Sequence, residues 1–188
     1  MGWRMTDVNH KPKSTAAAGH RPAPQPIGEF AAQAADYVRA AVGIELDYTS
    51  ETLPLVDHYL RGVPSQQPEL VELVITTAGA YFGEVVRRRL GGRWQLVAEK
   101  PTQWRMILPI GLSICPAGIA AAVIAQSDDL DDLDTGLDAP DPIWPVLEAA
   151  LERMSQVTTD EYFSLCGRLD TLEHLQEVLA AALARTME

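Results

Sequence analysis

Apolar residues recur at helical spacing along most of the chain, and the longest such segment runs from Pro68 to Leu90. Its apolar positions cover most faces of the helix, which indicates burial on several sides. Gly91 and Gly92 follow it and are typical of a helix end. The pattern therefore predicts that residues 68–90 form the central helix of a core.

The same periodicity predicts shorter helices on both sides of this segment. Hydroxyl and carboxyl side chains are common N-caps because they accept bonds from unpaired amides, so Ser50, Thr159 or Asp160, and Thr171 are candidate helix starts. The expected helices cover residues 28–42, 51–60, 116–126, 143–154, 161–167 and 172–185.

After Gly92 the apolar period changes from that of a helix to that of a strand. Residues 93–98 and 103–110 read as a hairpin around a turn at residues 99–102, and residues 112–114 are a candidate for a third strand. The predicted fold class is α+β, with about six helices around a small antiparallel sheet of two to three strands.

Composition divides the chain into two parts. Residues 1–26 are rich in Pro and Ala and carry a small excess of positive charge, so we expect a flexible tail. Residues 27–188 are expected to form a single globular domain, because a chain of this length suits one domain better than two. Within that domain, residues 128–141 read as an acidic loop with seven Asp and no cation.

The charge and the cysteines narrow the classes of function. The net charge of -11 would repel nucleic acid, and no run of about 18 uncharged apolar residues predicts a membrane span. Cys115 and Cys166 are far apart and follow no secretory leader, so we expect buried free thiols in a cytoplasmic protein.

Glu84 is the residue that most resembles an acid or base catalyst, because apolar neighbours raise the pKa of a carboxyl group. Arg87 and Arg88 lie on its helical face, so an ion pair is the simpler expectation. Gly79 and Gly83 suggest that another segment packs closely against this helix. We assign Gly79, Gly83, Glu84 and Trp94 to the structural core; the alternative is an open ligand pocket near Glu84, Arg87 and Trp94.

The acidic loop and the arginines at the C-terminal end of the central helix are the expected partner-binding residues. Spacing in the loop excludes an EF-hand calcium site, whereas Leu130, Leu133 and Leu137 could anchor a protein partner. The candidate partner-binding residues are Asp128, Asp129, Asp131, Asp132, Asp134, Arg88 and Arg89.

Other signatures of chemistry are weak. The four histidines have no Cys or His at metal-ligand spacing, and the chain has no phosphate-binding glycine loop. Asp57 and His58 could join Ser164 or Cys166 in a nucleophilic triad, but no G-x-S-x-G elbow supports this arrangement. We therefore expect no catalytic residue, metal or cofactor.

The segment Ala80-Tyr81-Phe82-Gly83-Glu84-Val85, followed by Gly91-Gly92-Arg93-Trp94, resembles bacterial domains of unknown function. In these domains a helix with an aromatic-Gly-Glu-Val stretch leads into a Gly-Gly-x-Trp strand. The resemblance implies a helix-to-strand layout and a bacterial origin, and it implies no activity.

These observations predict a noncatalytic protein-binding module, such as an adaptor, a regulator or an immunity-type protein. The alternative is a small enzyme or ligand-binding domain, and a subunit of a larger assembly is a third option. A solvent-open Glu84 would favour the enzyme, whereas a Glu84 sealed by protein groups would count against it.

Overall fold

A computed structural model describes residues 22–96, 99–154 and 157–186. These residues form seven α-helices, three short 3-10 helices and one small four-stranded sheet, which confirms the predicted α+β class. The α-helices are α1 (Gln25–Val42), α2 (Leu53–Arg61), α3 (Pro68–Leu90), α4 (Pro116–Ala125), α5 (Trp144–Arg153), α6 (Thr159–Tyr162) and α7 (Leu165–Thr186). The strands are β1 (Arg93–Gln95), β2 (Arg105–Ile107), β3 (Ser113–Ile114) and β4 (Leu137–Asp138).

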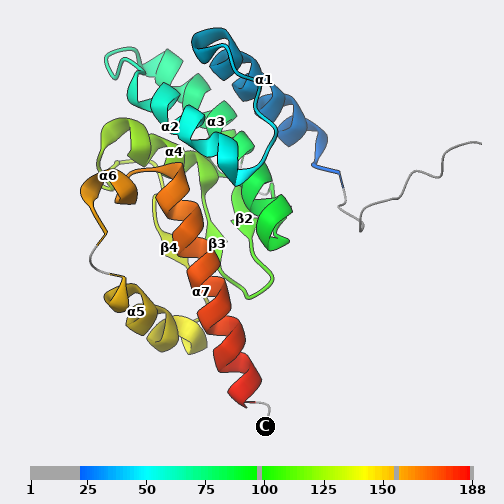
Figure 1. Ribbon diagram of the computed structural model, residues 1–188, viewed down its shortest axis with the longest axis vertical. Helices are drawn as coiled ribbons and strands as arrows, with labels where there is room; N and C mark the ends of the chain where they lie inside the picture. The colour runs from blue at the N-terminus through cyan, green and yellow to red at the C-terminus, as the bar shows by residue number, and fades with distance from the viewer. Residues whose placement is uncertain (1–21, 97–98, 155–156, 187–188) are drawn as a thin grey trace, which may run out of the picture.

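Helix α3 is the centre of the core, as its apolar pattern predicted. It packs against α1 and α4, and most of its residues after Val74 are buried. In Figure 1, α1, α2 and α3 gather at one end, while α7 runs away from them with α5 beside its far part.

Gly79 allows the close approach of α3 and α4. A Cβ atom built on Gly79 would lie 2.6 Å from Cα of Ala117 and 2.9 Å from the carbonyl carbon of Pro116. Because backbone atoms cannot move aside as a side chain can, only glycine fits at this position.

The sheet is an antiparallel meander in the order β1-β2-β3-β4. Trp94 pairs with Met106, Met106 pairs with Ile114, and Ile114 pairs with Leu137. The strands are shorter than the expected 93–98 and 103–110. Residues 101–103 form a 3-10 helix before β2, and a turn closed by the bond from the Gly111 amide to the Leu108 carbonyl follows it. Residues 97–98 lie outside the described residues, and the fourth strand, from the end of the acidic loop, was not expected.

Four predicted helix starts are wrong, and three of them differ from the structure by a few residues. Helix α1 begins at Gln25, so Pro26 stands in its first turn, where the missing N–H costs little. Ser50 opens a 3-10 helix and its side chain caps nothing. Helix α6 is capped by Thr158 rather than Thr159 or Asp160, in a capping box with Glu161.

The start of α7 is the largest correction. The helix begins at Leu165, and Thr171, the expected cap, lies inside it with its hydroxyl donating to the Gly167 carbonyl at 2.8 Å. Oγ of Ser164 accepts a hydrogen bond from the amide of Gly167 at 2.9 Å, so Ser164 is the residue that caps the start of α7.

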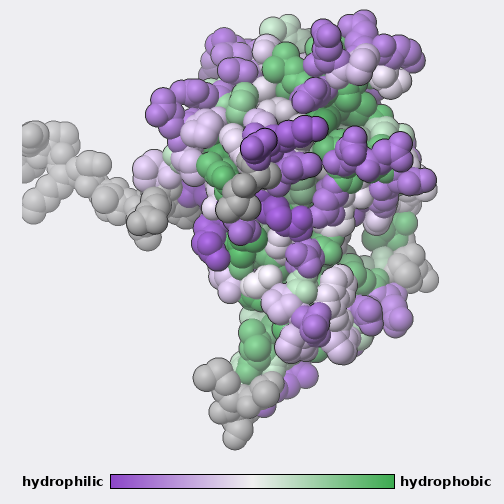
Figure 2. All heavy atoms as spheres, turned by 180° about the vertical axis from the view of Figure 1, so that it is seen from behind, coloured by the Kyte–Doolittle hydropathy of each residue, from purple (hydrophilic) through white to green (hydrophobic). Residues whose placement is uncertain are grey.

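The surface mixes polar and apolar side chains. The face opposite to that of Figure 1 is a mosaic of hydrophilic and hydrophobic residues (Figure 2). Among the described residues, no helix has both the length and the apolar character that a membrane crossing requires. The predicted tail, residues 1–26, lies outside the described residues up to Arg21.

Candidate functional site

A pocket of about 600 Å³ lies between α5, α6 and α7 and is bordered by the end of the acidic loop. Its volume is within the range of ligand-binding sites, and its lining is mostly apolar and aromatic. We call it the α5–α7 pocket. Its lining residues are Gly136, Leu137, Trp144, Leu151, Met154, Val157, Thr159, Tyr162, Phe163, Arg168 and Thr171.

A polar network joins the wall of this pocket to the acidic loop. Oδ1 of Asp128 accepts a hydrogen bond from Nη2 of Arg168 at 2.8 Å, and Oδ2 accepts one from the Tyr162 hydroxyl at 2.5 Å. The Arg168 guanidinium also lies 4.1 Å from the centre of the Tyr162 ring. Burial, together with the bond to Asp128, raises the pKa of Tyr162, so its hydroxyl remains a donor at neutral pH.

The acidic loop is anchored on the body of the protein. The hydroxyl of Thr135, which is buried, donates to the Asp128 carbonyl at 3.2 Å. A Cβ on Gly118 would overlap the carbonyl of Asp134, so the loop backbone lies directly on α4. Asp134 also pairs with Nη1 of Arg105 at 2.5 Å. Asp128 and Asp134 therefore hold the loop in place.

The carboxylates in the middle of the acidic loop, unlike those of Asp128 and Asp134, do not anchor it. Asp129, Asp131 and Asp132 are exposed, and their carboxylates form no ion pair or hydrogen bond with another residue that the structure describes. The expected apolar anchors do not face outward: Leu130, Leu133 and Leu137 are partly buried and pack against the core. The loop therefore presents carboxylates to solvent and uses its leucines for its own attachment.

The arginines in the last turn of α3 do not contact the acidic loop. The Arg88 guanidinium lies 4.1 Å from the centre of the Tyr48 ring, and Nε of Arg89 lies 2.6 Å from Oε1 of Glu173. The structure thus separates Arg88 and Arg89 from the five aspartates with which the sequence grouped them.

Glu84 is sealed by the chain's own donors. Its side chain is 2% exposed. Arg87 donates to both carboxylate oxygens at 2.8 Å, and Nε1 of Trp94 donates to Oε1 at 2.9 Å. The bond to Glu84 raises the pKa of Arg87. This geometry counts against an open catalytic pocket at Glu84.

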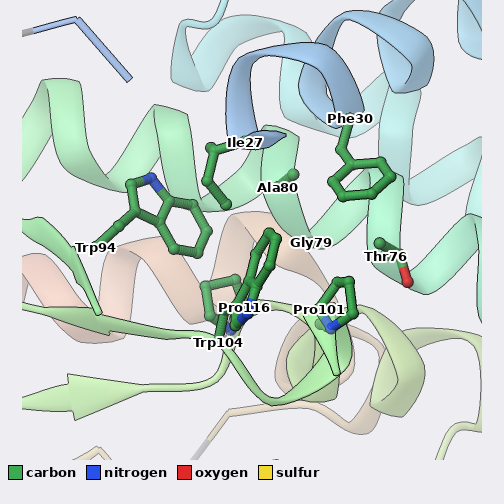
Figure 3. A pocket seen from close by; sticks show the side chains of 10 residues that line it. Ile27, Phe30, Thr76, Gly79, Ala80, Trp94, Pro101, Trp104 and Pro116 are labelled. Carbon is green, nitrogen blue, oxygen red and sulfur yellow. The ribbon is translucent and has the colours of Figure 1, made fainter. Parts of the chain in front are cut away.

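A small cleft does lie beside Trp94. Figure 3 shows Trp94, Trp104, Phe30 and Ile27 around it. Its volume is about 10 Å³, which is room for about one water molecule. A Cβ on Gly83 would overlap the Trp94 ring, so this glycine gives the indole the space it needs to reach Glu84.

The structure does bring Asp57, Ser164 and Cys166 together, but they meet at the start of α7, where Asp57 and Ser164 cap the helix. The Asp57 carboxylate accepts hydrogen bonds from the amides of Leu165 at 2.7 Å and Cys166 at 3.3 Å. It thereby places a negative charge at the N-terminus of α7. Burial and the bond to Asp57 raise the pKa of Cys166 to about 12. His58, the expected base, is exposed, so the observed contacts are those of a helix start.

The described residues contain no group of three His, Cys, Asp or Glu side chains that could hold a metal ion. Cys115 and Cys166 are free thiols, as expected. Cys115 is buried as expected, and burial raises its pKa, whereas Cys166 is only partly buried.

The sequence did not reveal the α5–α7 pocket. Trp144, Leu147 and Leu151 share one apolar stripe of α5, and only Leu147 of the three is fully buried. Val157 and Tyr162, which line the pocket, are each 42% exposed. A cluster of large apolar residues around a short helix was the available signal, and periodicity alone does not separate a pocket wall from a core.

Comparisons of the chain with models of protein families, with curated proteins and with solved structures found no match.

Proposed function

We propose that this chain is a noncatalytic protein-binding module that holds a basic segment of its partner against the acidic loop and the α5–α7 pocket. One observation carries the proposal: three exposed carboxylates, those of Asp129, Asp131 and Asp132, stand on an anchored loop whose end lines an apolar pocket. Charge and apolar surface therefore adjoin, as they do in many specific interfaces.

The two parts of this surface would contribute differently. Exposed carboxylates attract a basic partner over a distance of about a Debye length and favour correct partners over acidic ones. An apolar pocket supplies affinity when an aromatic or aliphatic side chain enters it and loses contact with water. The anchored loop lowers the entropy lost on binding, because its backbone is already held by Thr135 and Asp134.

The other candidate groups support a noncatalytic role. Glu84 is held by Arg87 and Trp94, Asp57 caps α7, and the raised pKa of Cys166 keeps its thiol protonated at neutral pH. A reducing cytoplasm suits two free thiols, and the proposed bacterial origin rests on the resemblance of residues 80–94 alone.

The test compares partner capture by two variants with equal changes of charge. Asp129, Asp131 and Asp132 changed to Asn removes the exposed carboxylates of the loop and leaves Asp128 and Asp134 in place. Glu51, Glu72 and Glu99 changed to Gln is the control, because these residues are also exposed. We expect the loop variant to lose captured partners that the wild type and the control retain. Any partner that it still captures should dissociate from it at a lower salt concentration than from the wild type.

Equal capture by both variants would reject the acidic loop as the binding surface. Thermal unfolding of both variants must first match that of the wild type, so that a loss of capture reports on the surface rather than on folding.

A further inference from the structure

Residues 1–21, which lie outside the described residues, match the chemistry of the proposed binding surface. They contain four cations and a single carboxylate, Asp7, which leaves a net charge of +3. Their large apolar residues, Met1, Trp3, Met5 and Val8, lie close to Arg4 and Asp7 in the sequence. The cations are Arg4, Lys11, Lys13 and Arg21.

The rest of the chain is strongly acidic. Because the whole chain carries -11, residues 22–188 carry -14, and half of that charge comes from the seven Asp of residues 128–141. Arg168 and Arg105 offset Asp128 and Asp134, but Asp129, Asp131 and Asp132 remain exposed. The N-terminal segment and this loop therefore carry opposite charges and attract each other.

The pocket beside the loop suits an apolar side chain of that segment. Its volume of about 600 Å³ exceeds that of one indole ring, and Trp144, Met154 and Phe163 offer aromatic and thioether contacts. Its mouth carries Val157 and Tyr162, whose exposed apolar surface would be covered by an occupant.

The length of the segment permits the contact. Twenty-one extended residues span up to about 70 Å, whereas a compact domain of this size has a radius of gyration of roughly 15 Å. A segment that joins the domain at Pro22 can therefore reach the acidic loop from any side.

We propose that residues 1–21 bind to the acidic loop and the α5–α7 pocket of their own chain, with Trp3 or Met5 in the pocket and the cations on the exposed aspartates. The segment then competes with the external partner for one surface. This inference rests on the proposed function for the identity of the surface, and it holds for the isolated protein with no partner present.

The test places a paramagnetic label in the full-length chain. Cys115 is buried and the pKa of Cys166 is about 12, so a cysteine introduced by Val8→Cys is the thiol that a label will modify. We expect the amide signals of Leu137, Tyr162 and Phe163 to lose most of their intensity, and those of α1 and α3 to keep theirs. Added salt should reverse the loss, because it screens exposed charges.

Two further variants separate charge from nonspecific proximity. Arg4, Lys11 and Lys13 changed to Gln should abolish the signal loss, whereas R4K, K11R and K13R together keep the charge and should preserve it. Signal loss spread evenly over the domain, or loss that survives the Gln changes, would overturn the proposal.

Mixing labelled protein with isotope-labelled protein that lacks the paramagnetic group identifies the occupant. Signal loss that arises only between molecules would assign the pocket to the segment of a second copy and overturn binding within one chain. Failure of this inference can be distinguished from failure of the proposed function. If partner capture depends on the loop but no signals are lost, only the inference is rejected. If the signals are lost but the loop variant captures partners as well as the wild type does, only the proposed function is rejected.

Discussion

Oδ1 of Asp57, on α2, accepts a hydrogen bond of 2.7 Å from the amide of Leu165, the first residue of α7 and 108 positions later in the chain. This bond places a buried carboxylate against the positive end of a 22-residue helix. It joins two elements whose relation no local pattern could indicate.

Asp57→Ala should therefore destabilise the protein strongly. Removing a charged acceptor leaves two helix amides without their partner, at a cost of about 2–4 kcal/mol in the free energy of unfolding. Asp170→Ala, an exposed change on α7, is the control and should shift that free energy by under about 0.5 kcal/mol. Chemical denaturation measures both, and equal midpoints for the two variants would contradict the capping role.

Glu84→Gln should also destabilise the fold, because Arg87 would lose its charged partner inside the protein. Loss of one member of a buried ion pair typically costs about 3–5 kcal/mol. Since Arg87 also loses its partner when Glu84 is removed, a double variant with Arg87→Met should cost less than the sum of the single changes. Additive costs in a denaturation series would show that the two side chains do not act as a pair.

Two glycine-to-alanine changes should have opposite signs. At Gly79 the added methyl would lie 2.6 Å from the backbone of Ala117, so we expect a loss of about 1–3 kcal/mol despite the better helix propensity. At Gly28, on α1, nothing lies within 4 Å of the added methyl. That change should stabilise the protein by about 0.5–1 kcal/mol. Thermal unfolding compares them directly, and a stabilised Gly79→Ala variant would refute the close approach of α3 and α4.

The cysteines of the native protein should be almost unreactive near neutral pH. Burial and Asp57 raise the pKa of Cys166 from the ordinary 9.0 to about 12, and burial raises that of Cys115. For Cys166 this lowers the thiolate fraction by roughly a thousandfold. A colorimetric thiol reagent should react slowly with the native protein and at once with both thiols of the unfolded chain.

The raised pKa of Cys166 should make the protein less stable as the pH becomes alkaline. A thiol whose pKa is raised by folding contributes stability that is fully present below its unfolded pKa. That contribution from Cys166 should fall as the pH rises from about 9 to about 12. Cys166→Ser should flatten this alkaline loss, and Asp57→Ala should lower the pKa of Cys166. An unchanged alkaline profile in Cys166→Ser would contradict the assignment.

Local sequence was sufficient where the signals lie within one element. Helix α3 begins at Pro68 and ends at Leu90 as predicted, because proline suits a first turn and Gly91 takes the left-handed conformation that ends the helix. The step from α3 to a strand at Arg93 and Trp94 followed from the change of period after Gly92. The separation of an acidic loop from a mostly helical body likewise came from composition.

Contacts between distant residues decided the rest. Helix α7 starts at Leu165 because Asp57, on another helix, satisfies its first amides. Asp128 and Asp134 hold the acidic loop because Arg168 and Arg105 meet them, while Arg88 and Arg89 lie elsewhere.

Propensity, periodicity and composition act over a few neighbouring residues, so they were enough to predict the helical core, its central helix and the distribution of charge. Contacts made in the folded chain set which charges are neutralised, where α7 begins and how α5, α6 and α7 form a pocket. These features depend on packing between segments that are remote in the chain, and a pattern of apolar positions is the same for a wall that faces a pocket as for one that faces the core.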